Sequence, residues 1–353
     1  MPQDLLGTFF NYDFPDPQYL GAKYVHRGWI AQFIPQEAHT VLDAFGGSQS
    51  IAYMLKQLGK RVITNDFLNC CNQIGKALIE NSDITLDQND LDILFSDNRD
   101  TSSFNLMEHL FCNLFFSYED TVFLDAFRSN VSLLDNPYKQ SMALTVICRS
   151  MTRKVTMGHF AHTQAINYAS NPERIKRNRS LIRPVKDLFL ELLPKYNAAV
   201  FDNNYENKSY NDNILELLPN LSNIDFAYFD PPYCNSHADY QSFYHLLETY
   251  VEYWKDKMFV NGTRRYEPKR FSGFDRKSDA LLNLKRLFEL SKNIPYWLIS
   301  YNDRSYPGVE TMISLLKMYH RNVRVEQKPY HIGRGGKGSV AGSSEILFIC
   351  KTN

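Results

Sequence analysis

The sequence of 353 residues lacks the patterns that mark metal centres, disulfide frameworks and membrane spans. Its six cysteines form no CxxC pair, so we expect neither a zinc site nor a disulfide framework, and no bound metal. No apolar run reaches the roughly 18 residues of a transmembrane helix, and the first residues do not read as a secretory signal. These absences predict a protein of the reducing cytoplasm with no membrane partner.

Net charge is also absent, because 39 basic residues balance 39 acidic ones. A polyanionic partner would therefore have to meet a local basic face, since the protein as a whole exerts no net attraction on it. Hydrophobic residues make up 44% of the sequence, so a packed core is expected rather than disorder.

A strand, a glycine turn, a helix and a second strand follow one another between residues 41 and 66. The strand at 41–45 leads into two glycines, and Ser48 is expected to cap a helix that Gly59 ends. The second strand, "RVITND", ends in Asp66. This unit predicts an α/β fold with a doubly wound, Rossmann-like sheet.

The glycine turn and Asp66 are together typical of a nucleotide-binding site. Glycine lets a ligand approach backbone amides, and an acid about 20 residues further on accepts hydrogen bonds from ribose hydroxyls. The turn is not the GxGxxG of dinucleotide-binding enzymes, which argues against a nicotinamide oxidoreductase. An ordinary turn with an exposed acid is the alternative interpretation of this stretch.

The stretch "IDFAYFDPPY", residues 224–233, is an apolar strand that runs into an acid, two prolines and an aromatic ring. The prolines fix Asp230 and the carbonyl of Pro231 as two acceptors, which suits the two hydrogens of an exocyclic amino group. Tyr233 offers a face on which a base can stack. Open α/β sheets bind ligands at the carboxyl ends of strands, so we interpret this corner as a reaction site rather than a simple proline turn.

The spacing of the motifs predicts an inserted segment. Asp43 and Asp230 lie 187 residues apart, whereas three βα units of roughly 30 residues each would fill only about half of that stretch. We therefore predict an inserted, mainly helical domain at 96–195, between a first part of the fold at 1–95 and a second part at 196–353.

Hydrophobic periodicity predicts the remaining elements. Helices are expected at 141–151, 185–194, 244–257, 281–292 and 308–320, with a helical turn at 211–219. Strands are expected at 198–202, 224–229, 296–302 and 345–351. The glycine-rich stretch 333–344 is expected to form a flexible, hairpin-like loop.

These motifs resemble those of the DPPY-type DNA adenine methyltransferases, in their alpha motif order. "YLGAK" at 19–23 resembles the family's aromatic-x-G-x-K opening, and residues 43–49 resemble D-x-F-x-G-x-G, with Gln49 at the last glycine. "SYNDNILELLP" resembles the acidic element before DPPY. The resemblance covers about 1–75 and 196–353, and nothing in the inserted segment itself resembles a known motif. The motif order implies that 1–95 is the cofactor-binding half, that 96–195 is an inserted target-recognition domain and that 196–353 is the catalytic half.

The resemblance implies roles at the matching positions. The implied cofactor is S-adenosylmethionine, and its predicted contacts are Tyr19, Lys23, Asp43, Phe45, Gly47, Asp66 and Asp212. The predicted catalytic residues are Asp230, Pro231, Pro232 and Tyr233. For Lys23 a surface lysine is the alternative interpretation, and for Asp212 a helix cap.

The implied reaction is methylation of a flipped adenine in duplex DNA. A bacterial restriction–modification system is the expected setting, with a cognate restriction endonuclease as system partner and the bacterial cytoplasm as location. The same chemistry on DNA cytosine or RNA adenine stays open, although Asp230 favours adenine because cytosine-specific relatives more often have Ser there. A non-catalytic DNA-binding module on a decayed methyltransferase fold is the alternative from another class.

Two basic stretches predict a DNA-binding face. Residues 149–186 hold nine Lys or Arg against the single acid Glu173, and 262–277 form a second basic loop. Phosphate contacts would position the enzyme, and interleaved His, Gln and Asn would read base edges. Solvated charge runs are the alternative. The predicted DNA-binding residues are Arg153, Lys154, Arg174, Lys176, Arg177, Arg179, Arg264 and Arg265.

Overall fold

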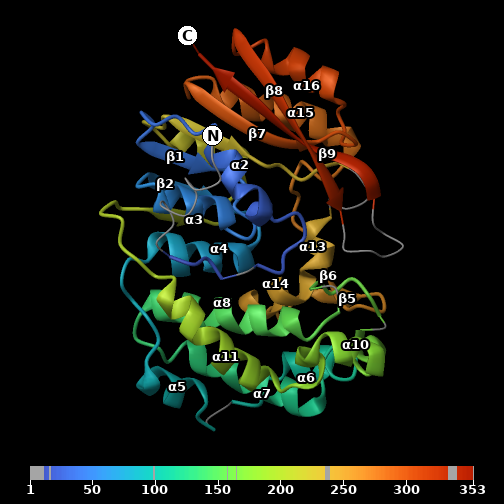
Figure 1. Ribbon diagram of the computed structural model, residues 1–353. Coiled ribbons are helices and arrows are strands. Elements are labelled where there is room, and N and C mark those ends of the chain that lie inside the picture. The colour runs from blue at the N-terminus through green and yellow to red at the C-terminus, as the bar shows by residue number, and fades with distance from the viewer. Residues whose placement is uncertain are drawn as a thin grey trace.

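A central mixed sheet organises the structure, which describes residues 12–15, 17–97, 100–156, 158–163, 165–234, 239–332 and 340–352. The computed structural model in Figure 1 shows this sheet in the upper half of the molecule. Its strands are β1 (Thr40–Asp43), β2 (Arg61–Asn65), β3 (Lys208–Tyr210), β4 (Phe226–Phe229), β7 (Tyr296–Asn302), β8 (Asn322–Ile332) and β9 (Val340–Lys351). They are arranged in the order β3-β2-β1-β4-β7-β9-β8.

The strand directions are those of a doubly wound sheet that ends in an antiparallel pair. Strands β3, β2, β1, β4 and β7 run parallel, whereas β9 runs antiparallel between β7 and β8. The order reverses between β1 and β4. Open α/β sheets bind ligands at such a reversal, outside the carboxyl ends of the strands. The predicted α/β, Rossmann-like sheet is confirmed.

Alternate side chains of the strands enter two hydrophobic cores, one on each face of the sheet. Val41, Tyr228 and Leu298 belong to the first core, whereas Leu42 and Phe229 belong to the second. Parallel strands that are covered on both faces are apolar along their whole length. The first core is covered by α2 (Arg27–Ala31), α3 (Ser50–Gln57), α4 (Asn69–Gly75) and the π-helix η2 (Lys76–Glu80). The second is covered by α12 (Ile214–Leu217), the 3-10 turn η4 (Leu218–Asn220), α15 (Lys277–Ser291) and α16 (Val309–Leu316).

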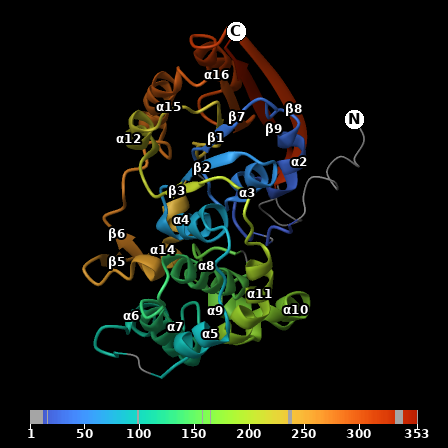
Figure 2. The ribbon, with the colours of Figure 1, turned by 90° about the vertical axis from the view of Figure 1, so that its left-hand side faces the viewer.

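The lower half of the molecule is helical, as Figures 1 and 2 show. Its helices from the middle of the chain are α5 (Gln88–Leu94), α6 (Leu106–Phe111), α7 (Tyr118–Val131), α8 (Pro137–Arg153), α9 (Ala165–Ala169), α10 (Pro172–Arg177), η3 (Arg179–Ile182) and α11 (Val185–Ala198). Every helix among the described residues is too short or too polar to cross a lipid bilayer.

Segments from beyond β4 join this helical half. They are α13 (Tyr240–Phe243), α14 (His245–Glu252) and the ribbon of β5 (Met258–Val260) and β6 (Arg265–Glu267). The Arg128 guanidinium of α7 donates to the carbonyls of Tyr250 and Val251 at 3.1 and 2.8 Å. The Tyr250 hydroxyl donates in turn to the carbonyl of Leu124 at 2.9 Å. Helix α14 is thereby fixed to the helices that precede it in the chain.

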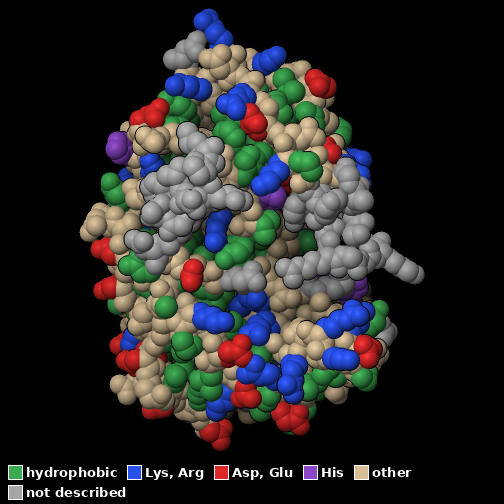
Figure 3. All heavy atoms as spheres, viewed as in Figure 1, with side chains coloured by type: hydrophobic (Ala, Val, Ile, Leu, Met, Phe, Trp, Pro, Cys, Tyr) green, Lys and Arg blue, Asp and Glu red, His purple; other side chains and the backbone are tan. Residues whose placement is uncertain are grey.

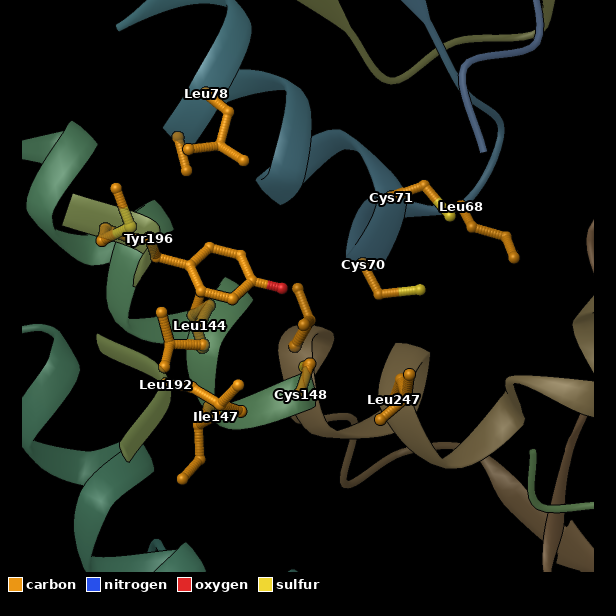
Figure 4. Close-up of a cluster of buried hydrophobic side chains, with 14 of the residues drawn as sticks. Leu68, Cys70, Cys71, Leu78, Leu144, Ile147, Cys148, Leu192, Tyr196 and Leu247 are labelled. Carbon is orange, nitrogen blue, oxygen red and sulfur yellow. The ribbon is translucent and has the colours of Figure 1, made fainter. Parts of the chain in front are cut away.

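One hydrophobic core connects the helical half to the sheet. Figure 4 shows side chains from α4, α8, α11 and α14 in a single cluster, among them Cys70, Leu144, Tyr196 and Leu247. The predicted division at residues 195 and 196 falls inside α11. The division into 1–95, 96–195 and 196–353 stays a prediction.

The strand expected at 198–202 is wrong, and β3 lies at 208–210 instead. The amides of Ala199 and Val200 complete the last turn of α11 by donating to carbonyls within it. Phe201 is buried, with its ring edge-on to that of Tyr53 at 5.4 Å between centroids. The apolar run therefore serves core packing, which periodicity cannot distinguish from strand pairing.

Two further elements end differently from expectation. Helix α14 stops at Glu252 rather than near 257, because Tyr253 adopts a left-handed backbone (φ +54°) and its hydroxyl donates to Asp125. Strand β9 begins at Val340, so 340–344 of the expected loop belong to a strand. The other residues of that loop, 333–339, lie outside the described residues.

Candidate active site

A cavity opens at the carboxyl ends of β1, β2 and β4. Asp43 is the last residue of β1, Asp66 follows β2 directly, and Asp230 follows β4 directly. The space between its walls, counted together with the open solvent at the mouth, is about 850 Å³. The predicted site residues that line it are Tyr19, Lys23, Asp43, Phe45, Gly47, Asp66, Asp230, Pro231, Pro232 and Tyr233. The sheet thus brings three separate motifs to one place.

The glycine turn after β1 has a left-handed backbone at Gly47 (φ +50°) and at Gln49 (φ +64°). The buried Gln49 side chain accepts a 2.7 Å hydrogen bond from the Thr64 hydroxyl and donates one of 3.4 Å to the carbonyl of Cys71. A Cβ at Gly46 would lie 2.3 Å from its Nε2. Gln49 therefore keeps the backbone conformation that glycine favours, and its side chain fills the space beside Gly46.

The start of α3 differs from the prediction that Ser48 caps it. Gln49 occupies the N-cap position, and no side chain caps the helix. The left-handed turn at Gln49 makes the helix begin at Ser50, whose hydroxyl accepts a 3.2 Å hydrogen bond from Ser48. The predicted stop is confirmed, because Gly59 follows the helix with φ +69°.

Asp66 fastens the glycine turn to the end of β2. Its carboxylate accepts hydrogen bonds from the amides of Gly47 at 2.7 Å and Leu68 at 2.8 Å. Burial raises the pKa of Asp66 to about 6, although these two amides oppose the shift. The side chain thus shapes the turn in addition to lining the cavity.

Asp43 is a buried carboxylate without a hydrogen-bonding partner among the described residues. Its exposed fraction is 1%. Burial and the nearby charge of Asp230 raise the pKa of Asp43 to about 8, and the amides of Phe45 and Ala52 oppose this without reaching hydrogen-bonding geometry. An unpaired acceptor in a cavity wall is suited to a cationic ligand.

The buried Lys23 forms an ion pair with the half-buried Asp230. Lys23, the first residue of the 3-10 turn η1 (Lys23–His26), places Nζ 3.0 and 2.8 Å from the two Asp230 oxygens. The Tyr233 hydroxyl lies 2.9 Å from Asp230 Oδ1. Burial by itself would lower the pKa of Lys23, but the charges of Asp230 and Glu345 outweigh it and raise that pKa. Lys23 is therefore not the surface lysine of the alternative interpretation.

Glu345 of β9 completes this cluster, and the sequence did not single it out. Its Oε1 lies 3.0 Å from the Tyr233 hydroxyl and 3.5 Å from Lys23 Nζ. Its exposed fraction is only 3%. The sequence did contain a signal, because side chains two residues apart in a strand point to the same face of the sheet. Glu345 stands two residues before Leu347, which faces the first core, so a buried position could have been expected for Glu345.

Aromatic side chains form a wall of the cavity that the sequence predicted only in part. Tyr19 stacks on Tyr244 with 4.4 Å between ring centroids, and the Tyr244 hydroxyl accepts a 2.6 Å hydrogen bond from the amide of Leu20. A Cβ at Gly21 would lie 2.6 Å from the hydroxyl of Tyr240, which also lines the cavity. The glycine of "YLGAK" is thus required by the approach of Tyr240.

Phe67 is a further cavity residue that was not predicted. Arg270, from the second basic loop, places its guanidinium carbon 4.3 Å from the centroid of the Phe67 ring. It also donates a 2.9 Å hydrogen bond to the carbonyl of Phe67. The basic loop therefore touches the wall that carries Asp66, and an aromatic residue directly after that acid was the available signal.

Asp212 does not lie in the cavity wall. It is exposed, and its amide and carbonyl pair with the side chain of Asn65 at 3.0 and 3.1 Å. Helix α12 is capped by Asn213, which accepts a hydrogen bond from the amide of Leu215. The position supports neither the predicted adenosine contact nor the alternative of a helix cap.

Two of the predicted DNA-binding residues are held by acids of the protein. Lys154 is 8% exposed, and its ammonium lies 2.8 Å from a carboxylate oxygen of Asp120. Arg153 pairs with Glu191 at 2.7 Å. Buried charges need such partners, so Lys154 has a structural environment that does not favour a phosphate contact.

The other predicted DNA-binding residues lie at or near the surface. Arg264 is exposed at the tip of the β5–β6 ribbon, and Arg265 beside it is half-buried. On α10 and η3 the exposed side chains are Arg174, Lys176, Arg177 and Arg179. Figure 3 shows Lys and Arg side chains gathered over the lower half of the face in view.

Contacts bring the two basic stretches together beside the cavity. The amide of Phe160 donates a 2.9 Å hydrogen bond to the carbonyl of Phe243, and its carbonyl lies 3.0 Å from His245 Nε2. A Cβ at Gly262 would lie 2.7 Å from the Thr163 side chain. The segment 158–163 therefore lies against both α13, which contributes Tyr240 to the cavity, and the ribbon.

Comparison with known proteins identifies the family of this chain. The family model of the D12 class N6 adenine-specific DNA methyltransferases matches residues 19–292. The type II methyltransferase M2.HphI of Haemophilus parahaemolyticus is 32% identical over 345 residues, which cover 96% of this chain and 98% of that protein. The modification methylase StsI of Streptococcus sanguinis is 29% identical over 152 residues, 42% of this chain and 22% of that protein. The chain belongs to the D12 class of N6 adenine-specific DNA methyltransferases.

Proposed function

We propose that the chain transfers a methyl group from S-adenosylmethionine to the exocyclic amino group of an adenine flipped out of duplex DNA. The observation on which this rests is the single cavity that holds both the DPPY corner and the glycine turn. A base at Asp230 and a cofactor at Gly47 would then share one enclosed space. Flipping the base out of the stack would cost a few kcal/mol, which contacts in the cavity would offset.

The residues present fit S-adenosylmethionine. The unpaired Asp43 carboxylate suits a cationic methionine group, and Asp66 and Phe67 offer a polar and an aromatic contact to a nucleoside. The cofactor, when bound, supplies a methyl group activated by the positive charge of its sulfur. Holding it beside the base supplies the proximity on which such transfers depend.

The chain's own groups orient the target amine. The Asp230 carboxylate and the Pro231 carbonyl would accept its two hydrogens, which leaves the nitrogen lone pair free to attack the methyl carbon. Lys23 and Tyr233 hold the Asp230 carboxylate in place. The nitrogen–carbon bond would form as the sulfur–carbon bond breaks, and the methylated amine would then release one proton to water.

Duplex DNA would dock on the basic stretches beside the cavity. Exposed Arg174, Lys176, Arg177 and Arg179 would neutralise phosphates, as would Arg264 at the ribbon. A restriction–modification system is part of the same proposal, because the relatives named above are a type II methyltransferase and a modification methylase. A cognate endonuclease and a location in the bacterial cytoplasm follow from that setting.

Methyl transfer with labelled S-adenosylmethionine tests the proposal. We expect N6-methyladenine in duplex DNA by nucleoside mass spectrometry, and sequencing of plasmid DNA from an expressing host should show modified adenines at one recurring sequence. The Asp230→Asn variant, which keeps the shape of the side chain, is the matched control. Label found only in cytosine or only in RNA, or equal transfer by wild type and variant, would overturn the proposal.

A further inference from the structure

One hydroxyl group lies between two carboxylates in the catalytic cluster. The Tyr233 oxygen is 2.9 Å from Asp230 Oδ1 and 3.0 Å from Glu345 Oε1. A phenol has one hydrogen to donate. With both acids ionised, one carboxylate oxygen would face a lone pair of Tyr233 at hydrogen-bonding distance, which is repulsive. The arrangement is satisfied only when one of the two acids has a proton of its own.

The position of Lys23 decides which acid is ionised. Its ammonium contacts both oxygens of Asp230, at 3.0 and 2.8 Å, but approaches Glu345 only to 3.5 Å. An ammonium stabilises the nearer carboxylate more strongly, since the Coulomb energy falls with distance. Asp230 is therefore the ionised member, and the proton belongs on Glu345.

We propose that Glu345 is a positioning residue that works as a protonated carboxylic acid. Its O–H donates to the Tyr233 oxygen, and the Tyr233 O–H donates to Asp230. This chain fixes the Asp230 carboxylate and the Tyr233 ring in the orientation that receives the target base. The inference rests on the proposed function, because it assigns Glu345 a role in that same site.

The surroundings of Glu345 favour its neutral form. Burial raises the pKa of Glu345, the charge of Lys23 lowers it, and the charge of Asp230 raises it. Hydrogen bonds to Tyr233 and Lys23 also lower this pKa, but the net shift is upward because burial is the largest contribution. The phenols of Tyr228 and Tyr240 also interact electrostatically with Glu345. On the neighbouring strand β8, Lys328 lies opposite Glu345 in the strand register. The carboxyl is thus almost enclosed, with Lys23 as the cation that acts against protonation.

Two substitutions distinguish a role for the proton of Glu345 from a role for its negative charge. Glu345→Gln keeps the shape and an N–H donor toward Tyr233 but removes the ionisable group, whereas Glu345→Ala removes the donor. We expect Glu345→Ala to lower kcat at least about tenfold, the size of a lost hydrogen bond to a charged network. Glu345→Gln should recover most of that loss. Because Glu345 is not among the described cavity-lining residues, the Kd of S-adenosylmethionine should stay within about twofold in both variants.

The pH profile distinguishes this role from a structural one. An acid that acts in its protonated form gives activity below its pKa, and that activity is lost as the pH rises through it. Asp43 and Asp66 also titrate in the cavity, with pKa values of about 8 and 6, so the comparison is between wild type and Glu345→Gln. When kcat is measured against pH, the wild type should show one decrease at alkaline pH that Glu345→Gln lacks. A Glu345→Gln variant as poor as Glu345→Ala would show that the negative charge is what matters, and would overturn the inference.

A measurement without DNA keeps this inference separate from the proposed function. Infrared difference spectra of protein with 13C-labelled glutamate, recorded against Glu345→Gln, should show the band of a protonated carboxyl near neutral pH. Buried Glu248, whose pKa burial raises to about 7, cancels because both proteins contain it. Absence of the band overturns the role of Glu345 even if methyl transfer is found, whereas its presence without methyl transfer overturns only the function.

Discussion

Asp43 gives the sharpest test of whether the cavity holds the proposed cofactor. In the free protein this carboxylate is buried and unpaired, and its pKa is raised from 3.8 to about 8. The substitution Asp43→Asn keeps the shape and removes the titration. We expect the variant to be more stable than the wild type without cofactor, and to bind S-adenosylmethionine less tightly.

The stability gain follows from proton linkage. For an acid whose pKa is raised on folding, the native state holds a proton that the unfolded state has released, so stability falls as the pH rises from about 4 to about 8. Each pKa unit corresponds to about 1.36 kcal/mol. Relative to Asp43→Asn, the wild type should therefore lose about 2 kcal/mol of unfolding free energy at pH 5 and about 5 kcal/mol at pH 8.

Urea unfolding at pH 5 and pH 8 measures this difference. The gain for Asp43→Asn should grow with pH, whereas the exposed Asp92→Asn should change stability by less than about 0.5 kcal/mol at either pH. A gain that does not change between the two pH values would refute the reasoning, since Asp43 would then not be protonated in the free protein.

Cofactor binding supplies the second half of the test. A cationic ligand favours ionised Asp43, so wild-type affinity should rise with pH up to about 8 and binding should release protons below that pH. Calorimetry in buffers of different ionisation enthalpy detects that release. Asp43→Asn should lose both effects and bind at least about tenfold more weakly.

Three further predictions follow from the site. Asp230→Asn should lower methyl transfer at least about 100-fold, because the proposed acceptor for the target amine is lost, while calorimetry should show cofactor binding within about threefold. Asp66→Ala should raise the Kd for S-adenosylmethionine at least about tenfold, since the glycine turn loses its anchor, whereas Asp212→Ala should change it less than about twofold. Charge reversal at Arg177 and Arg179 should weaken DNA binding on every sequence and reduce the salt slope by about 0.9 for each lost phosphate contact.

Controls for the DNA prediction lie on the opposite half of the molecule. Lys285 and Arg286 of α15 are an exposed basic pair at the sheet end in Figure 1. Charge reversal at Lys285 and Arg286 changes the net charge by as much as reversal at Arg177 and Arg179 does. Because this pair lies away from the proposed DNA-binding face, the salt slope should stay close to that of the wild type. Equal effects of the two double variants would show that only total charge matters. Normal DNA affinity after reversal at Arg177 and Arg179 would move the search to 262–277.

Short motifs were sufficient to predict that three strand ends meet at one edge of the sheet. The turn at Gly47, the acid at Asp66 and the corner at Asp230 each end an apolar strand, and parallel strands bring their carboxyl ends to one edge of the sheet. Their meeting in one cavity therefore needed only the order of the elements along the chain. Gln49, which replaces the last glycine of the family pattern, has only a local effect. Its side chain forms hydrogen bonds with neighbouring segments, and its backbone keeps the left-handed turn.

The tertiary structure alone decided which partners these residues have. Glu345 reaches Tyr233 only because β9 lies beside β7 in the sheet, and Arg270 reaches Phe67 only because its loop folds over β2. In the same way the fold gave Lys154 an acidic partner. Local sequence encodes backbone turns and strand ends, whereas burial and charge pairing depend on contacts between distant segments. Those contacts decide whether a lysine such as Lys154 can bind a phosphate, and which carboxyl group of the cluster holds a proton.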